Sequence, residues 1–145
     1  MRCSNGVSCA GAAALACVLW VSVPMAQQAE GQQVEIPKTA TTLEGVPAVR
    51  LDSTEQGAAR RVLTAAEAAK NRLSVRVDAG QFYWTSRDNR PLRLDSTGGF
   101  TYLQDKPGSY IRFTKVGDKI TYVEHVDRGL DSVTYWGELR IVLGK

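Results

Sequence analysis

The only histidine of the chain is the residue best suited to acid–base chemistry. His125 is the single histidine among 145 residues, and an imidazole titrates close to neutral pH. Asp127 lies two residues further on and shares one face of a strand with it, whereas Glu124 points to the opposite face. These residues predict a hydrolase-type site in which His125 works with Asp127 or Glu124. Because no Gly-x-Ser-x-Gly frame supplies a nucleophile, the preferred interpretation is a structural histidine.

Carboxylates around one turn form a second candidate site. Glu124, Asp127 and Asp131 surround the same turn, and carboxylates on a turn can bind Ca²⁺. Their spacing does not follow the EF-hand pattern, and a single histidine without nearby cysteines does not make a zinc site. Gly98 and Gly99 precede a predicted strand rather than a helix, so they do not form a phosphate-binding loop. The sequence therefore predicts neither a cofactor nor a metal.

Aromatic and arginine side chains predict a binding surface. The aromatic residues that follow residue 26 all fall between Phe82 and Trp136, and they occupy both faces of the predicted strands. Some rings must therefore lie outside a single core, where they can stack on a ligand or partner. The candidate ligand-binding residues are Trp136, Tyr83, Trp84, Arg87 and Arg90. The predicted ligand is a protein, a glycan or a small molecule, although Asp88 and Asp95 offset part of the arginine charge.

The elements that position these residues are predicted to be β-strands over residues 73–143. Apolar and polar residues alternate from Leu73 onward with the period of a strand. Gly117 and Asp118 separate two β-rich runs, and a glycine in the first loop position is typical of a type II′ hairpin. Pro91 indicates an edge strand, and Gly137 a bulge or bend in the last strand. Seven or eight short strands at this spacing predict an antiparallel β-roll, barrel or small sandwich.

One helix is predicted before these strands, and an extended segment before the helix. Capping boxes occur at Ser53–Gln56 and Thr64–Glu67. They predict either a helix over the whole of 53–73 or a shorter one over 64–71, where Ala-Ala-Glu-Ala-Ala-Lys strongly favours a helix. Residues 27–52 contain two prolines and no sustained period, so they are interpreted as a flexible or extended leader, with short edge strands possible at 34–36 and 48–51. The folded domain is then predicted to cover residues 53–145.

The first 26 residues have the parts of a secretory signal. A basic start at Arg2 precedes an apolar run from residue 9 to residue 23 and a small residue, Ala26. The run is shorter than the roughly 20 residues that span a bilayer. We expect cleavage near Ala26, with Ala29 as an alternative site. An uncleaved anchor and a lipid anchor on Cys17 are the other interpretations.

Export would change the composition and limit the partners. Cys3, Cys9 and Cys17 all precede Ala26, so the mature chain would have no disulfide and no thiol nucleophile. The net charge of +3 would fall to +2 through the loss of Arg2, which is too little to predict nucleic-acid binding. No stable membrane span is expected in the mature chain.

A function hypothesis follows from this combination of features. We expect a periplasmic or extracellular binding or interaction module without catalytic activity. The alternatives are a hydrolase that uses His125 and a structural protein of the cell envelope.

Overall fold

The computed structural model describes residues 31–106 and 108–145. The predicted secretory signal, its cleavage near Ala26 and the three cysteines lie outside the described residues and stay predictions. Within the two described ranges, no helix has the length and apolar character needed to cross a membrane.

The described residues form nine β-strands and one α-helix. The strands are β1 (Ala40–Thr54), β2 (Gly57–Val62), β3 (Leu73–Asp78), β4 (Gln81–Trp84), β5 (Arg90–Thr97), β6 (Phe100–Lys106), β7 (Ser109–Val116), β8 (Lys119–Asp127) and β9 (Ser132–Leu143), and the helix is α1 (Ala65–Lys70). Neighbouring strands are antiparallel throughout. The prediction of a mainly β, antiparallel fold with one helix before the strands of residues 73–143 is confirmed.

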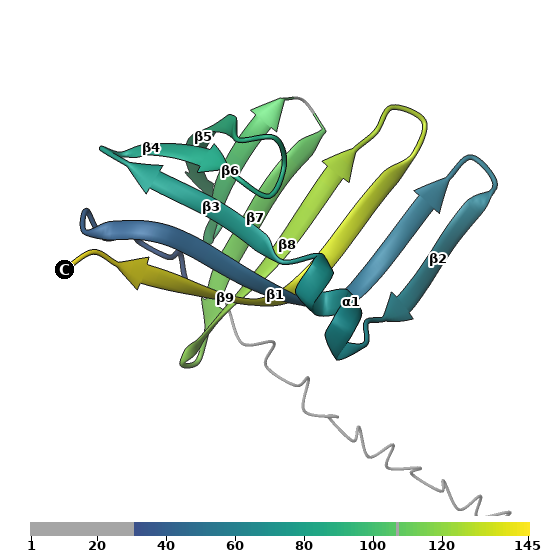
Figure 1. The fold of residues 1–145 in the computed structure, drawn as a ribbon, viewed down its shortest axis with the longest axis horizontal. Helices are drawn as coiled ribbons and strands as arrows, with labels where there is room; N and C mark the ends of the chain where they lie inside the picture. Colours follow the sequence, from purple (N-terminus) through teal and green to yellow (C-terminus); the bar gives the residue numbers. More distant parts are fainter. Residues whose placement is uncertain (1–30, 107) are drawn as a thin grey trace, which may run out of the picture.

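Strand β1 closes the sheet into an eight-stranded barrel. Strands β3 to β9 follow one another as a meander, and β1 pairs with β3 at one end of it and with β9 at the other. Strand β2 pairs only with the second half of β1, so the two form a hairpin that stands beside β9 (Figure 1). Closure of this kind leaves few free strand edges.

The segment predicted as a leader contains the closing strand, so this prediction is corrected. Residues 40–52 belong to β1, which pairs with β9 from Ala40 to Ser53. A register shift between Pro47 and Val49 inserts one extra residue, Ala48, opposite β9. Such a bulge reverses the alternation of inward and outward side chains, and therefore the segment shows no sustained period.

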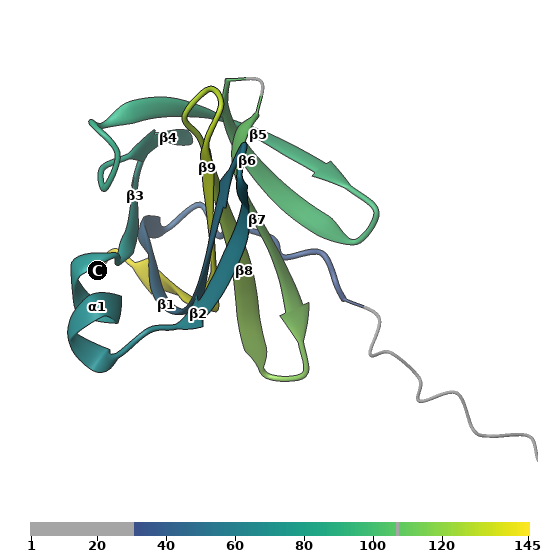
Figure 2. The same cartoon turned by 90° about the vertical axis from the view of Figure 1, so that its right-hand side faces the viewer.

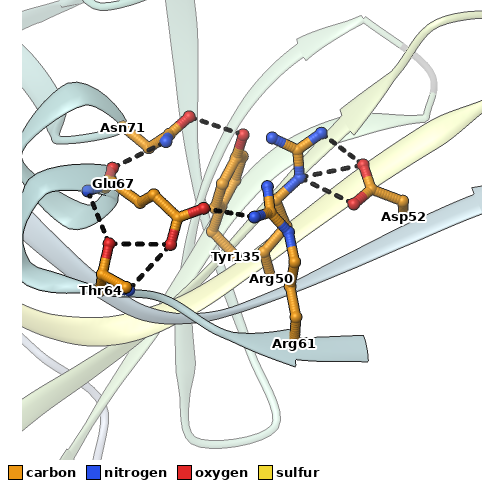
Figure 3. Close-up of polar contacts among 7 residues, drawn as sticks. All are labelled: Arg50, Asp52, Arg61, Thr64, Glu67, Asn71 and Tyr135. Atoms are coloured by element: carbon orange, nitrogen blue, oxygen red, sulfur yellow. Dashed lines mark hydrogen bonds and ion pairs between the residues drawn. The ribbon is translucent and has the colours of Figure 1, made fainter. Parts of the chain in front are cut away.

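The shorter of the two predicted helices is the one that forms. Thr64 caps α1, with its hydroxyl accepting from the Glu67 amide and the Glu67 carboxylate accepting from the Thr64 amide. Glu67 also pairs with Arg61 of β2 (Figure 3). The capping box predicted at residues 53–56 is wrong, because Ser53 lies in β1 and pairs with Ala58 of β2.

Three turn and strand predictions can be compared with the structure. Gly117 has φ of +60° while Asp118 is not among the residues with positive φ, as a type II′ turn requires. The edge strand predicted from Pro91 is found in part, because Pro91 pairs with Tyr83 of β4 whereas residues 93–97 of β5 pair with β6 alone. The bulge predicted at Gly137 lies on the partner strand, at Ala48.

Large side chains fill the middle of the barrel. Trp84, Phe113 and Tyr122 are among the largest fully buried side chains, and they come from three different strands. The interior of an eight-stranded barrel is just wide enough for such a filling. A second apolar cluster packs α1 against β9 and consists of Leu63, Ala68, Val133 and Tyr135. Figure 2 shows α1 beside one end of the barrel.

Candidate functional site

The barrel wall has a gap where β5 continues beyond β4. Strand β4 pairs only with residues 90–92 of β5. The remainder of β5, from Arg93 to Thr97, pairs with β6 alone. The chain turns from β3 into β4 at Ala79 and Gly80, which both have positive φ, and this short hairpin leaves one side of β5 without a neighbouring strand.

An N-terminal strap, residues 31–38, crosses this gap. Gln32 and Lys115 exchange two backbone hydrogen bonds of 3.0 and 2.8 Å, and the Thr101 hydroxyl donates to the Val34 carbonyl at 2.8 Å. The Val34 side chain is buried in the barrel core, and Ile36 packs against that core. Figure 2 shows the strap in dark blue, entering between the tips of the β5–β6 and β7–β8 hairpins.

A pocket of about 650 Å³ lies between the strap and the gap. Its apolar lining comprises Val34, Ile36, Val77, Phe82 and Leu94. Leu94 pairs with Leu103, which is fully buried, and side chains of paired residues lie on the same face of a sheet. Leu94 therefore faces the barrel interior, yet 47% of it is exposed. An apolar side chain that faces inward and is still accessible shows that the barrel is open on this side.

The other end of the barrel contains a buried carboxylate. Glu124 is fully buried, and its Oε1 atom lies 3.0 Å from Nη2 of Arg87. Arg87 belongs to the loop between β4 and β5, where Asp88 and Asn89 have left-handed backbone conformations. Glu124 therefore holds this loop across the end of the barrel through an ion pair.

The surroundings of Glu124 favour its protonated form. Burial raises the pKa of Glu124 to about 7, although Arg87 and the indole N–H of Trp84 oppose this. The indole is near the carboxylate but does not reach the geometry of a hydrogen bond. Burial, and then the charge of Glu124, also raise the pKa of the Tyr122 hydroxyl. Burial thus raises the pKa values of both Glu124 and Tyr122. Neither residue, nor Arg87, lines the pocket at the strap.

Tyr135 links α1 to the loop that carries Arg87. Its hydroxyl donates to Oδ1 of Asn71 at 2.9 Å (Figure 3). The guanidinium groups of Arg50 and Arg87 lie 5.6 and 5.8 Å from the centre of its ring, at cation–π distance. Arg50 in turn donates hydrogen bonds to the Asp52 carboxylate. These bonds raise the pKa of Arg50 and lower the pKa of Asp52. These contacts stabilise the end of the barrel.

His125 lies outside the barrel, in a different chemical setting from the one predicted. Its Nδ1 atom is 2.9 Å from the Thr134 hydroxyl, and its ring stacks on Tyr110 with 5.3 Å between centres. Within the described residues, no hydrogen bond or ion pair joins it to Asp127, which accepts instead from the Gly129 amide at 2.8 Å. Glu124 points into the barrel. The three candidate residues of the alternative, hydrolase-type site are therefore not joined to one another by hydrogen bonds or ion pairs in the described residues.

The predicted ligand-binding residues fall into two groups. Trp84, Arg87 and Arg90 lie together, with Arg90 5.7 Å from the Trp84 ring centre and paired with Asp105. Tyr83 is half-buried on the outside of β4 beneath Arg76, and Trp136 is half-buried on the outside of β9. Trp136 lines a separate groove of about 370 Å³. In the described part of the chain, no group of three or more metal-ligating side chains occurs.

Comparison of the chain with protein-family models, curated proteins and solved structures gave no match. The function must therefore be inferred from the sites themselves. The pocket at the strap was missed by sequence reasoning because nearly half of its lining residues lie in the segment interpreted as a leader. The one available signal was the alternation of Val34 and Ile36 around Glu35, which is typical of a half-buried extended chain.

Proposed function

We propose that this domain is a non-catalytic binding module that holds a small apolar molecule in the pocket at the strap. The observation that carries the proposal is Leu94, an inward-facing leucine that is 47% exposed at the open side of a barrel. A volume of about 650 Å³ falls in the range of small-molecule sites.

The lining of the pocket favours an uncharged, apolar body in the ligand. Val77, Phe82 and Leu94 contribute apolar side chains to its barrel side, next to the uncharged Ser96 and Thr101. The charged residues of the lining, Glu35 and Lys38, are exposed on the strap. Transfer of apolar surface from water contributes about 25 cal/mol per Å², so an apolar ligand gains most from this site. The secretory features of residues 1–26 support a location in the periplasm or outside the cell.

A leucine-to-arginine pair of variants tests the site. We expect the uncharged dye N-phenyl-1-naphthylamine to bind the wild-type protein with increased fluorescence. Leu94→Arg replaces part of the apolar lining by a charged side chain and should weaken binding by about 10-fold or more, since a bound apolar dye would have to displace water from that charge. Leu130→Arg is the matched control, because Leu130 is 78% exposed in the turn between β8 and β9, and should bind the dye as the wild type does.

Circular dichroism and thermal melting of both variants show whether the fold is kept. Equal loss of dye binding in the two variants would contradict the proposal, as would unchanged binding by a folded Leu94→Arg protein.

A further inference from the structure

A row of side chains on the outer face of the sheet crosses six strands. In the observed registers, each member pairs with the next across β6, β7, β8, β9, β1 and β2. The row consists of Tyr102, Arg112, Val123, Trp136, Val49 and Val62. Only Arg112 is charged, and all but the exposed Val62 are half-buried. Aromatic residues and arginine with few other charges are the composition of the centre of a protein interface.

The row contains a groove of about 370 Å³, which we call the Trp136 groove. Phe100 and Arg112 line one part of it, Val123 and Trp136 line another, and Val49 lies on the neighbouring strand β1. The groove is therefore an apolar depression with one guanidinium group in its wall.

Arg112 has no carboxylate partner in the described part of the chain. Its guanidinium lies 4.6 Å from the centre of the Phe100 ring, and no ion pair to it is found there. The nearest acidic residue on its own face along β9, Glu138, pairs with Lys119. Asp95, which pairs with Tyr102 at the end of the row, accepts instead from the Ser96 amide. A half-buried arginine on an aromatic ring is complementary to a carboxylate supplied from outside.

We infer that the Trp136 groove is a docking site for a segment of another protein that carries an acidic side chain beside a bulky apolar one. The carboxylate binds Arg112, and the apolar side chain packs against Trp136 and Val123. The row extends across six strands, and apart from Arg112 its partly exposed side chains are uncharged. A small molecule would cover only part of it, which favours a polypeptide as the occupant. This surface is separate from the pocket at the strap, so either site can exist without the other.

Selection from a phage-displayed library of random 12-residue peptides tests this inference. Peptides are selected on the full chain and then compared on Arg112→Gln, which removes the charge. Arg93→Gln is the matched control, because Arg93 lies on β5 outside the groove and contacts Gln104. We expect enriched peptides with Asp or Glu next to Leu, Ile, Phe or Trp. They should bind Arg112→Gln at least 10-fold more weakly and Arg93→Gln as the wild type.

The position of bound peptide is read from the indole signal of Trp136 in nuclear magnetic resonance spectra. Melting curves establish that each variant is folded. Enriched peptides without acidic residues, equal binding to Arg112→Gln, or no enrichment at all would overturn the inference. A competition arm uses hexanoate: displacement of the peptides by hexanoate at comparable concentration would assign the groove to small carboxylates instead.

Discussion

Replacement of Arg87 by methionine is expected to lower the free energy of unfolding by about 3 kcal/mol at pH 9, because it leaves a buried carboxylate without its counter-charge. Glu124 is fully buried and its ion pair in the described residues is with Arg87. Methionine keeps most of the apolar stem of the arginine, so the loss of stability arises mainly from removal of the guanidinium charge. Chemical denaturation at several pH values measures the effect.

The loss should depend on pH in a defined direction. Burial already raises the pKa of Glu124 from 4.5 to about 7 in the folded protein, and removal of Arg87 raises it further. A folded-state pKa above the unfolded one means that folding takes up a proton, so each protein loses stability as the pH rises from about 4.5 to its own folded-state pKa. Below about pH 7 Glu124 is protonated in both folded proteins and both lose stability equally. The difference between Arg87→Met and wild type should therefore be small at pH 4.5, begin to grow above about pH 7, and be large at pH 9.

Two further variants make this prediction specific. Arg76→Met removes an exposed pair with Asp78 and should change stability by at most about 1 kcal/mol. The double variant Arg87→Met, Glu124→Gln has no buried charge and should recover most of the stability at pH 9. A loss that is the same at both pH values, or that the double variant does not reverse, would show that Glu124 is not the source.

Gly137→Ala is expected to prevent normal closure of the barrel. A Cβ atom at this position would lie 2.0 Å from the Val46 carbonyl oxygen and 2.8 Å from the Pro47 Cα atom. Both atoms are backbone atoms next to the bulge in β1, so they cannot move aside as a flexible side chain does. We expect the free energy of unfolding to fall by about 3 kcal/mol, at the upper end of the cost of overpacking, or the protein to fail to fold.

Gly80→Ala separates this steric effect from the general cost of replacing glycine. Gly80 has φ of +81° and open space around its Cβ position, so alanine should cost about 1 to 2 kcal/mol through its backbone conformation alone. Equal stability losses at residues 80 and 137 would contradict the close approach of β1 and β9. Denaturant midpoints of the two variants make the comparison.

The parts of the fold that are set by local chemistry were predictable. The capping box at Thr64 and the strong helix formers after it predicted α1, and the glycine at 117 predicted a hairpin turn. Regular alternation from Leu73 onward predicted the strands. These signals lie within a few residues of one another, so they do not depend on the rest of the structure.

The closing strand was not predictable in the same way. Before the bulge at Ala48, the odd-numbered residues Leu43 and Pro47 face the interior of the barrel. After the bulge, the even-numbered Arg50 pairs with the buried Tyr135 and so lies on the inner face. This shift conceals the period of two. The strap likewise has its partners in β6 and β7, more than 60 residues away, and no local pattern encodes that contact.

Only part of the candidate chemistry could be predicted from the sequence. The position of Glu124 between Tyr122 and Val126 on one strand face indicates a buried carboxylate, but its partner Arg87 comes from a loop between two other strands. His125 is the one histidine of the sequence, and its neighbours Thr134 and Tyr110 are set by strand register. Contacts of this kind exist only once the barrel is closed.

The most direct test of the proposed binding site is a measurement of nuclear Overhauser effects between bound N-phenyl-1-naphthylamine and methyl groups of the protein. We expect contacts from the dye to the methyl groups of Val77 and Leu94 in the barrel and of Val34 in the strap. Contacts confined to exposed methyl groups such as those of Val62 or Leu130, with none to Leu94, would contradict it.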